Sequence, residues 1–457
     1  MKRMNRFRKR QSRVPSLLPC LLVAFEAAAG TTDFPFGTPE SIALPEELSP
    51  TCIALADRDG DGDLDAVVAS RTQEGRIILL DGGPGGTLAV VGELAAPDQT
   101  DWIETADLDG DGDLEIVAGV RGSRGRIAIF DGLPGGTFAE TPLVLPAGRE
   151  IRCLRIDDLD GDGVPDIVAV AHRSEELITF LGDGLGGFEL VQRSRLAPWR
   201  NGQVYPQSIE TADLDLDGNP DTLTVSIGAS SVHLARGTDA GPGTRSRAWV
   251  APPVGGQTGG SAYLSIADLD GDGLPELVLP QTTFGQQWFV LHELDARGDI
   301  ESSRTVQASP FGVSWISDTA DFDADGDEDL CIGHALPGVL VFMENVTEPG
   351  GPAVFAEPQW LFQGEFIRHL IACDVDFDGD QDVVALDYTG DQILIFRNGT
   401  VGGGLAGGDP RDGAKPDPTP EALRSLEGPE LLKLLSDLDG DGVTDLRRKD
   451  RTAGGAR

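Results

Sequence analysis

The sequence predicts an all-β protein, a seven-bladed β-propeller with four-stranded blades. Three observations lead to this prediction. An acidic nine-residue loop recurs along most of the chain, seven of its copies start 50 to 55 residues apart, and a short β-branched segment follows each copy. A period of about 50 residues is typical of one four-stranded propeller blade. Seven such units in a row therefore predict seven blades.

The recurring loop carries carboxylates at positions 1, 3, 5 and 9 and glycine at position 6. Its first copy consists of Asp57, Asp59, Asp61 and Asp65, with Gly62 at position 6. Alternate carboxylates on a tightly curled loop supply the oxygens, about six to eight at ~2.3–2.6 Å, that Ca²⁺ requires, and the backbone carbonyl of position 7 would add another. Glycine permits the sharp turn because it adopts a left-handed conformation at little cost. The loop therefore predicts a calcium site.

The predicted metal ligands, with position 7 included, follow the same order in every copy. In the first four copies they are Asp57, Asp59, Asp61, Asp63 and Asp65; Asp107, Asp109, Asp111, Asp113 and Glu115; Asp158, Asp160, Asp162, Val164 and Asp166; and Asp213, Asp215, Asp217, Asn219 and Asp221. In the last four they are Asp268, Asp270, Asp272, Leu274 and Glu276; Asp321, Asp323, Asp325, Asp327 and Asp329; Asp374, Asp376, Asp378, Asp380 and Asp382; and Asp437, Asp439, Asp441, Val443 and Asp445. Position 6 is glycine in all eight copies, which favours metal binding over a chance acidic turn.

The residues around each loop argue against an EF-hand. An EF-hand has helices on both sides and a bidentate glutamate at position 12. Here position 12 is Val68 in the first loop and Ala385 in the seventh. The segments that follow the loops are DAVVAS, EIVAGV, DIVAVA, ELVLP and DVVAL. Such short β-branched runs predict strands.

These segments resemble the FG-GAP/VCBS repeat, the unit of the integrin-α-type β-propeller. The resemblance rests on DLDGDGDLEIVAGV, RGRIAIFDGLPGGTF and ITFLGDGLGGFEL, and it covers roughly residues 34–400. It implies the propeller fold and about seven structural Ca²⁺ sites, and it names no ligand. Because Glu115 and Glu276 are longer than the aspartates at position 9 elsewhere, we expect their two loops to bind Ca²⁺ more weakly. The eighth loop has no blade to hold it, so ordering it should cost entropy and weaken Ca²⁺ binding there too.

The two ends of the propeller segment predict a circular closure. Residues 34–45, FPFGTPESIALP, resemble the last strand of a blade, as in GGTFAETPLVLP at 135–146, yet no acidic loop precedes them. The seventh blade lacks its last strand after QILIFRN at 392–398. We therefore expect the N-terminal strand to complete the final blade and remove an open edge.

The chain outside the propeller divides into three predicted segments. Residues 1–29 combine a basic start, the apolar run VPSLLPCLLVAF and small residues at 27–29, which predicts a signal peptide and a secreted, cell-surface or periplasmic protein. A basic tail with a short apolar anchor is the alternative, and the run is too short for a membrane span. Residues 30–398 form the propeller and 399–420 a Gly/Pro-rich linker. Residues 421–457 resemble a helix followed by half of an EF-hand or dockerin-like calcium loop, or else a Ca²⁺-ordered tail.

Composition disfavours several function classes. The net charge of −40 makes nucleic acid an improbable partner, because phosphate binding needs basic patches. The five histidines form no HExxH motif, and the sequence contains no GxSxG elbow and no P-loop. We therefore expect structural Ca²⁺ and no enzyme. Cys52, Cys153, Cys331 and Cys373 are expected to be free thiols, although pairing of the last two stays open.

A binding surface is the better functional hypothesis. The start of each inner strand lies at the face opposite the calcium loops, and candidate ligand-binding residues there are Trp102, Glu104, Arg152, Tyr205, Glu210, Tyr263, Trp315, Arg368 and His369. Aromatic rings and charges around a channel mouth suit a carbohydrate or protein ligand. The alternative is that these aromatic rings fill the gaps between blades.

Three functions follow from these features. The first is a monomeric, secreted, calcium-binding module for a carbohydrate or protein ligand. The second is a polysaccharide-active lyase or hydrolase, which would need a basic and acidic pair in the channel, such as Arg152 or His369 with Glu104 or Glu210. The third is a structural cell-surface scaffold that assembles through the C-terminal module.

Overall fold

The structure is a computed structural model. It describes residues 36–399 apart from 123–124, 197–203, 228–230, 239–240, 242–245, 251–260, 283–287, 309–312 and 336–337. The chain divides into two compact units, Met1–Phe34 and Pro35–Arg457, and the fold below belongs to the second. The predicted signal peptide, almost all of the linker, and the C-terminal module with the eighth loop lie outside the described residues.

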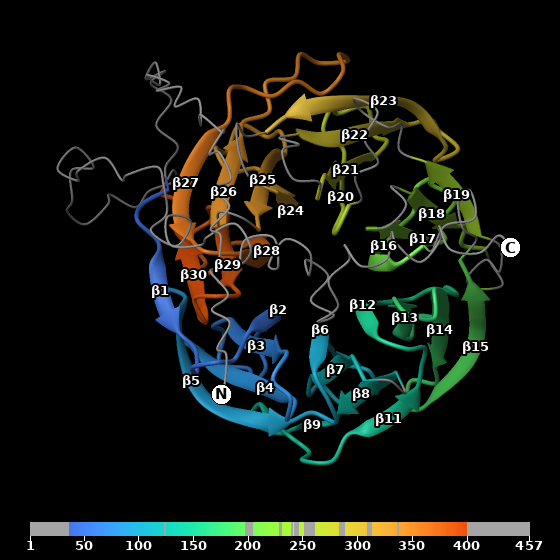
Figure 1. Cartoon of the computed structure of the whole chain (residues 1–457), viewed down its shortest axis with the longest axis vertical. Coiled ribbons are helices and arrows are strands. Elements are labelled where there is room, and N and C mark those ends of the chain that lie inside the picture. Colours follow the sequence, from blue (N-terminus) through green and yellow to red (C-terminus); the bar gives the residue numbers. More distant parts are fainter. Residues whose placement is uncertain are drawn as a thin grey trace, which may run out of the picture. The chain divides into compact units, whose positions relative to one another are not determined.

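Seven four-stranded antiparallel sheets follow one another around a central axis (Figure 1). Each sheet is one blade, and this confirms the predicted all-β, seven-bladed propeller. The first three blades are β2 (Pro50–Ala56), β3 (Asp65–Ser70), β4 (Arg76–Gly83) and β5 (Thr87–Ala95); β6 (Thr100–Ala106), β7 (Glu115–Val120), β8 (Arg126–Phe130) and β11 (Leu143–Pro146); and β12 (Ile151–Asp157), β13 (Asp166–Ala171), β14 (Glu176–Gly182) and β15 (Phe188–Arg195). A small hairpin, β9 (Gly132–Leu133) and β10 (Thr137–Phe138), precedes the outer strand of blade 2.

The remaining blades repeat the same order from the inner to the outer strand. Blades 4 and 5 are β16 (Pro206–Ala212), β17 (Asp221–Ser226), β18 (Ser231–Ala235) and β19 (Ser246–Val250); and β20 (Ser265–Ala267), β21 (Glu276–Pro280), β22 (Trp288–Leu294) and β23 (Ile300–Gln307). Blades 6 and 7 are β24 (Ser314–Ala320), β25 (Asp329–His334), β26 (Gly338–Met343) and β27 (Gln359–Gly364); and β28 (Ile367–Cys373), β29 (Asp382–Asp387), β30 (Gln392–Phe396) and β1 (Glu40–Ala43).

The burial of each strand explains its composition. The second strand of a blade is covered on both faces by neighbouring blades, and all six residues of β3, β7 and β13 are buried. A near-continuous apolar run suits that environment. The inner strands β2, β6 and β12 are buried at their start and half-buried in the three residues that lead into the acidic loop. The acidic loop joins the inner and second strands.

The predicted circular closure is confirmed. β1 pairs antiparallel with β30, with Glu40 opposite Ile395 and Ala43 opposite Gln392. Leu44 and Leu48, which follow β1, belong to one apolar cluster with residues of blades 1 and 7. The N-terminal strand therefore covers the edge of the last blade and joins it to the first.

Glycine-rich turns connect neighbouring blades. The turn before the outer strand of a blade lies against the acidic loop of the preceding blade. A Cβ atom at Gly136 of blade 2 would lie 2.7 Å from Cβ of Asp59 in blade 1, and one at Gly86 of blade 1 would lie 2.5 Å from the carbonyl oxygen of Val375 in blade 7. We call these segments the inter-blade turns. Only glycine fits at Gly86, because the backbone of the preceding blade approaches so closely.

Candidate metal centres and central pocket

The acidic loops are curled by hydrogen bonds from their own backbone. In the first loop, Oδ1 of Asp57 accepts the N–H of Gly60 at 2.8 Å and Oδ2 accepts that of Gly62 at 3.0 Å. Oδ1 of Asp59 accepts the N–H of Asp61 at 3.2 Å. The glycine at position 6 has φ between 85° and 101° in all seven described loops, a left-handed conformation that favours glycine. The sequence therefore fixes the direction of each carboxylate.

Carboxylate oxygens converge in the described loops. Three acidic residues offer oxygens within 4.8 Å of one another in at least five of them: Asp57, Asp59 and Asp61; Asp107, Asp109 and Glu115; Asp158, Asp160 and Asp166; Asp213, Asp215 and Asp217; and Asp268, Asp270 and Glu276. An all-oxygen donor set of this kind fits a hard divalent cation such as Ca²⁺. These clusters could hold metal ions.

The position 9 carboxylate has a structural role that the sequence did not reveal. Asp65 is buried, its Oδ2 accepts the N–H of Arg58 at 3.0 Å, and its Oδ1 accepts that of Gly82 at 2.6 Å. Glu115 makes the same two contacts with Leu108 and Gly132, at 2.6 and 3.2 Å. Position 9 thus ties the loop to the end of the third strand. Weaker Ca²⁺ binding at Glu115 stays a prediction.

Burial raises the pKa of several position 9 carboxyl groups. The pKa rises to about 6 for Asp166, about 7 for Asp329 and Asp382, and about 8 for Glu276. The neighbouring aspartates raise these values further, whereas backbone N–H groups lower them. A divalent cation among the carboxylates would offset this repulsion.

The loops differ in the charged side chain that approaches them from the end of the third strand of the blade. In loop 4, Nη1 of Arg236 lies 2.5 Å from Oδ2 of Asp221 and 3.4 Å from Oδ2 of Asp215. In loop 7, Nη1 of Arg397 lies 3.0 Å from Oδ2 of Asp376. These arginines occupy part of the carboxylate surface that a cation would use, although their loops carry the same acidic pattern as the others.

Loops 5 and 6 receive an acidic neighbour instead. Burial and the surrounding carboxylates, Glu293 among them, raise the pKa of Asp270 in loop 5. Burial and neighbouring carboxylates that include Glu344 raise the pKa of Asp323 in loop 6. These two loops therefore present more negative charge than loops 4 and 7.

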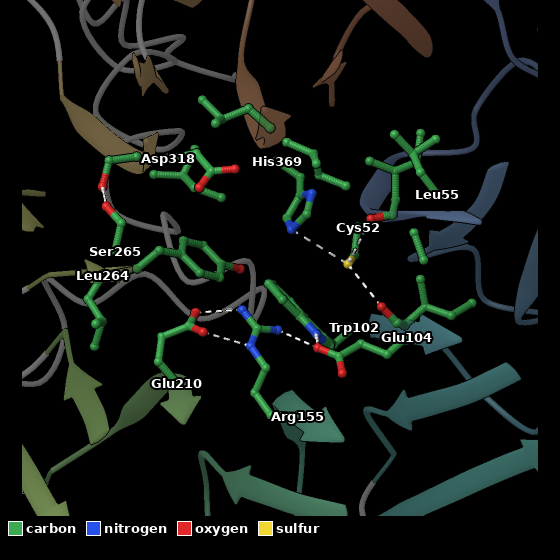
Figure 2. A pocket seen from close by; sticks show the side chains of 18 of the residues that line it. Cys52, Leu55, Trp102, Glu104, Arg155, Glu210, Leu264, Ser265, Asp318 and His369 are labelled. Carbon is green, nitrogen blue, oxygen red and sulfur yellow. Dashed lines mark hydrogen bonds and ion pairs between the residues drawn. The ribbon is translucent and has the colours of Figure 1, made fainter. Parts of the chain in front are cut away.

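The inner strands enclose a central pocket of about 520 Å³. Arg155 crosses it: Nε and Nη2 donate to the two oxygens of Glu210 at 2.8 and 2.5 Å, and Nη1 donates to Oε1 of Glu104 at 2.5 Å. Figure 2 shows Arg155 between these two carboxylates, each of which comes from a different blade. Three consecutive blades are thereby joined by one guanidinium.

Aromatic side chains line the same pocket. Trp102 stacks with Tyr263 at 5.5 Å between ring centroids and meets His369 edge-on at 4.9 Å. Arg155 lies over the Trp102 ring at 4.9 Å. Cys52 lies 3.7 Å from Nε2 of His369, but burial raises the pKa of the Cys52 thiol to about 12. The thiol is therefore protonated at neutral pH and is no nucleophile.

Asp318 and two hydroxyl groups complete the polar lining. Oδ1 of Asp318 accepts the N–H of Thr319 at 3.0 Å, and Oδ2 accepts that of Ala372 at 2.9 Å. Burial raises the pKa of Asp318 to about 6. The hydroxyl oxygens of Ser265 and Ser317 lie 2.5 Å apart.

The structure brings some of the predicted ligand-binding residues together and separates others. Trp102, Glu104, Glu210, Tyr263 and His369 line the pocket. Arg152, Trp315 and Arg368 are buried and are not part of its lining, and Tyr205 is half-buried against His172.

Arg155 and Asp318 were missed, although the repeat offered a signal. Both stand three residues before the first aspartate of a loop, the same position as Glu104 and Glu210. The four cysteines in the described residues, Cys52, Cys153, Cys331 and Cys373, are free thiols.

Comparisons with known proteins agree with the repeat and the fold. The FG-GAP-like repeat family matches residues 57–118, 107–169, 158–224 and 213–279. No curated protein sequence matches the chain. Among the described residues, no helix has the length and apolar character needed to cross a membrane.

Two crystal structures of BBS1N in complex with ARL6DN share the fold. The one soaked with mercury has 12% identity and a TM-score of 0.53, and covers 80% of this chain and 97% of that chain. The one soaked with lead has 11% identity and a TM-score of 0.54, and covers 81% and 98%. Identities this low show a similar fold alone.

Proposed function

Because this chain belongs to the FG-GAP-like repeat proteins, we propose that it is a secreted, calcium-binding propeller whose central pocket binds a carbohydrate or protein ligand. The observation that carries the metal part is the acidic loop, in which backbone hydrogen bonds orient the carboxylates of positions 1 and 3. Secretion is supported by the predicted signal peptide at 1–29.

Calcium in the loops would be structural. Each described loop joins the inner and second strands of a blade, and the loops of blades 1 to 4 and 7 lie against the inter-blade turn of the following blade, as Asp59 does at Gly136. A cation at positions 1, 3 and 5 would neutralise carboxylates that otherwise repel one another. About seven ions would stiffen the blades and their contacts, and none lies in the pocket that the ligand would use.

The pocket supports a binding role through its chemistry. It combines the stacked rings of Trp102 and Tyr263 with the Arg155 network and the carboxylate of Asp318. Sugar rings and planar peptide groups pack well on aromatic faces, and polar groups at the rim fix their orientation. A propeller of similar fold, BBS1N, occurs in complex with ARL6DN, which favours a protein ligand no less than a sugar.

Metal removal tests the first part of the proposal. A ligand that binds only the folded state adds RT ln(1 + [L]/Kd) per site, ~2.7 kcal/mol at a hundredfold excess over Kd. Excess EGTA should therefore lower the melting temperature by many degrees, and added Ca²⁺ should restore it. Mg²⁺ at the same concentration serves as the control cation. An unchanged melting curve in EGTA would contradict structural calcium.

A glycan array and a library of peptides, probed with the Ca²⁺-loaded protein, test the second part. Any hit should be lost in Asp318→Asn, in Ser317→Ala or in both if the pocket binds it, and retained in Glu189→Gln, a matched change at an exposed position of β15. Hits that survive Asp318→Asn and a second pocket change, Ser317→Ala, would place the ligand elsewhere.

A polysaccharide-active lyase or hydrolase is the second candidate, and Asp318 favours it. A carboxyl group with a pKa of about 6 can exchange protons near neutral pH, which general acid or base catalysis requires. Turnover of a polysaccharide that binds, lost in Asp318→Asn while binding persists, would support catalysis. Binding without turnover would leave the binding module as the function.

A further inference from the structure

The inner strands carry a shared bulge at the end of the propeller opposite the acidic loops. In six blades the register of the inner and second strands skips one residue, six positions before the first aspartate of the loop. A bulge turns a side chain away from the direction that a regular strand would give it. The skipped residues are Thr51, Asp101, Arg152, Gln207, Trp315 and Arg368, and all of them are buried.

Arginines gather around one carboxylate at this end. Nε of Arg71 lies 2.5 Å from Oδ1 of Asp101, and Nε of Arg152 lies 3.4 Å from Oδ2. Burial by itself raises the pKa of Asp101, but Arg71, Arg152, Arg121 and Arg368 together hold it well below its usual value. We call these four side chains the arginine cluster. Arg121, Arg152 and Arg368 are buried, and the side chain of Arg71 is 7% exposed.

The charges in this region do not balance. Asp101 is the shared acidic neighbour of the four guanidinium groups. Glu150 lies 3.6 Å from Nη2 of Arg152, but it also accepts a hydrogen bond from Arg173 at 2.7 Å. Among the described residues, Arg71, Arg121 and Arg368 thus share Asp101 as their acidic neighbour. The excess is positive, inside a protein whose net charge is −40.

Part of the uncompensated positive charge lies on Arg368. Its side chain is 1% exposed and its guanidinium lies over the Trp315 ring at 4.9 Å. Among the described residues, Nε and Nη2 of Arg368 have no hydrogen-bond partner, and neither have Nη2 of Arg71, Nη1 of Arg121 and the hydroxyl of Tyr263. These groups are hydrogen-bond donors, and the three guanidinium groups can act in no other way.

Buried donors of this kind require an acceptor, and buried positive charge requires a negative one. Water could satisfy the donors but would not balance the charge. We propose that the arginine cluster binds a small anion, either a free inorganic anion or acetate, or the carboxylate group of a larger ligand such as a uronic acid. The planar fork of a guanidinium matches a carboxylate with two parallel hydrogen bonds. The four arginines are not part of the central-pocket lining, and this site does not rest on the function proposed above.

Anion dependence of thermal stability tests the proposal. The full-length, Ca²⁺-saturated protein is exchanged into HEPES, whose bulky sulfonate is the only anion. It is then titrated with chloride, acetate or glucuronate at constant ionic strength. We expect a saturable rise of a few degrees in the melting temperature of the parent with at least one of these anions. Arg368→Leu should abolish that rise, and Arg368→Lys, which keeps the charge, should retain part of it.

A second arginine, half-buried in the central pocket, provides the control. Arg155 is already bonded to Glu104 and Glu210, so Arg155→Leu should lower the melting temperature at every anion concentration and keep the saturable rise. In HEPES alone, Arg368→Leu should melt at or above the parent, because it removes a charge without a counter-ion.

The arms of the titration separate the two sources of anion. A rise with chloride or acetate identifies a free anion, and a rise with glucuronate alone identifies a ligand carboxylate. No saturable rise in the parent, or the same rise in Arg368→Leu, would overturn the proposal. The proposal would also be overturned if Arg368→Leu were less stable than the parent by the same amount at every anion concentration. That result would show that groups of the protein itself compensate the charge of Arg368. Failure of the EGTA test would leave this result unaffected.

Discussion

At the scale of single residues, the seven described loops differ less in their aspartates than in the side chain that approaches from the third strand. Arg236 places a guanidinium 2.5 Å from Asp221 in loop 4, whereas Glu293 adds negative charge near loop 5. A tethered cation competes with a free one for the same oxygens. The order of calcium affinity is therefore expected to follow this neighbour as well as position 9.

Arg236→Gln should tighten calcium binding at loop 4. The change removes a positive charge from the carboxylates and keeps a polar side chain, and we expect about tenfold tighter binding, the effect of ~1.4 kcal/mol. Calorimetric titration of the metal-stripped protein measures it. Arg76→Gln is the control, because Arg76 pairs with Glu93 on an outer strand away from any loop. Unchanged or weaker binding in Arg236→Gln would show that the arginine does not compete.

Buried histidines make the fold sensitive to acid. His334 is fully buried, neither ring nitrogen has a hydrogen-bond partner among the described residues, and burial lowers its pKa from 6.5 to about 4. The unfolded chain binds a proton near pH 6.5 and the folded chain does not. The stability that a neutral His334 retains is therefore fully present above pH 6.5 and is lost as the pH falls towards 4.

His334→Gln should flatten this part of the pH profile. The loss in the parent is of order 3 kcal/mol across the window, by linkage between protonation and folding. Chemical denaturation between pH 7 and 4 in parallel samples gives the difference between the two proteins, and acid effects on the carboxylates cancel in that difference. Equal slopes for the two proteins would mean that His334 is not the titrating group.

At the scale of the elements, the N-terminal strand is the part whose removal should matter most. Deleting residues 30–46 removes β1 and Leu44 and exposes β30, including Ile393 and Ile395. An unpaired apolar edge promotes association with other chains. We expect aggregation or a lower melting temperature, whereas deletion of 405–457 should be tolerated. If both truncated proteins melt like the parent, β1 does not hold the ring closed.

Some structural elements could be predicted from the sequence, and others could not. The acidic loop, the strand after it and the closing strand each follow from a local pattern, as in Asp57–Asp65 or FPFGTPESIALP, and the structure has them where they were expected. The bridge from Glu104 through Arg155 to Glu210 joins residues about fifty positions apart. Its partners meet only after three blades have assembled, so no single repeat contains it. The bulges that bury Arg152 and Arg368 likewise depend on strand register, which composition does not determine.

At the scale of the whole molecule, the net charge of −40 is unevenly distributed. The acidic loops gather carboxylates at one end of the inner strands, and the arginine cluster gathers positive charge at the other. Divalent cations at the first end and a small anion at the second would each reduce a local excess. The two ends of the propeller are therefore expected to respond to different ions.

The contact between an inter-blade turn and the acidic loop of the preceding blade gives the ring of blades a direction. Asp59 lies against the turn at Gly136 in the blade that follows, and Val375 of blade 7 lies against the turn at Gly86 of blade 1, so both contacts point the same way around the circle. A defect in one loop should then spread asymmetrically. In Asp59→Asn, hydrogen–deuterium exchange should quicken in β9 and β10 of blade 2 and remain slow in β29 and β30 of blade 7. Equal quickening on both sides would show that disturbance travels around the circle without a preferred sense.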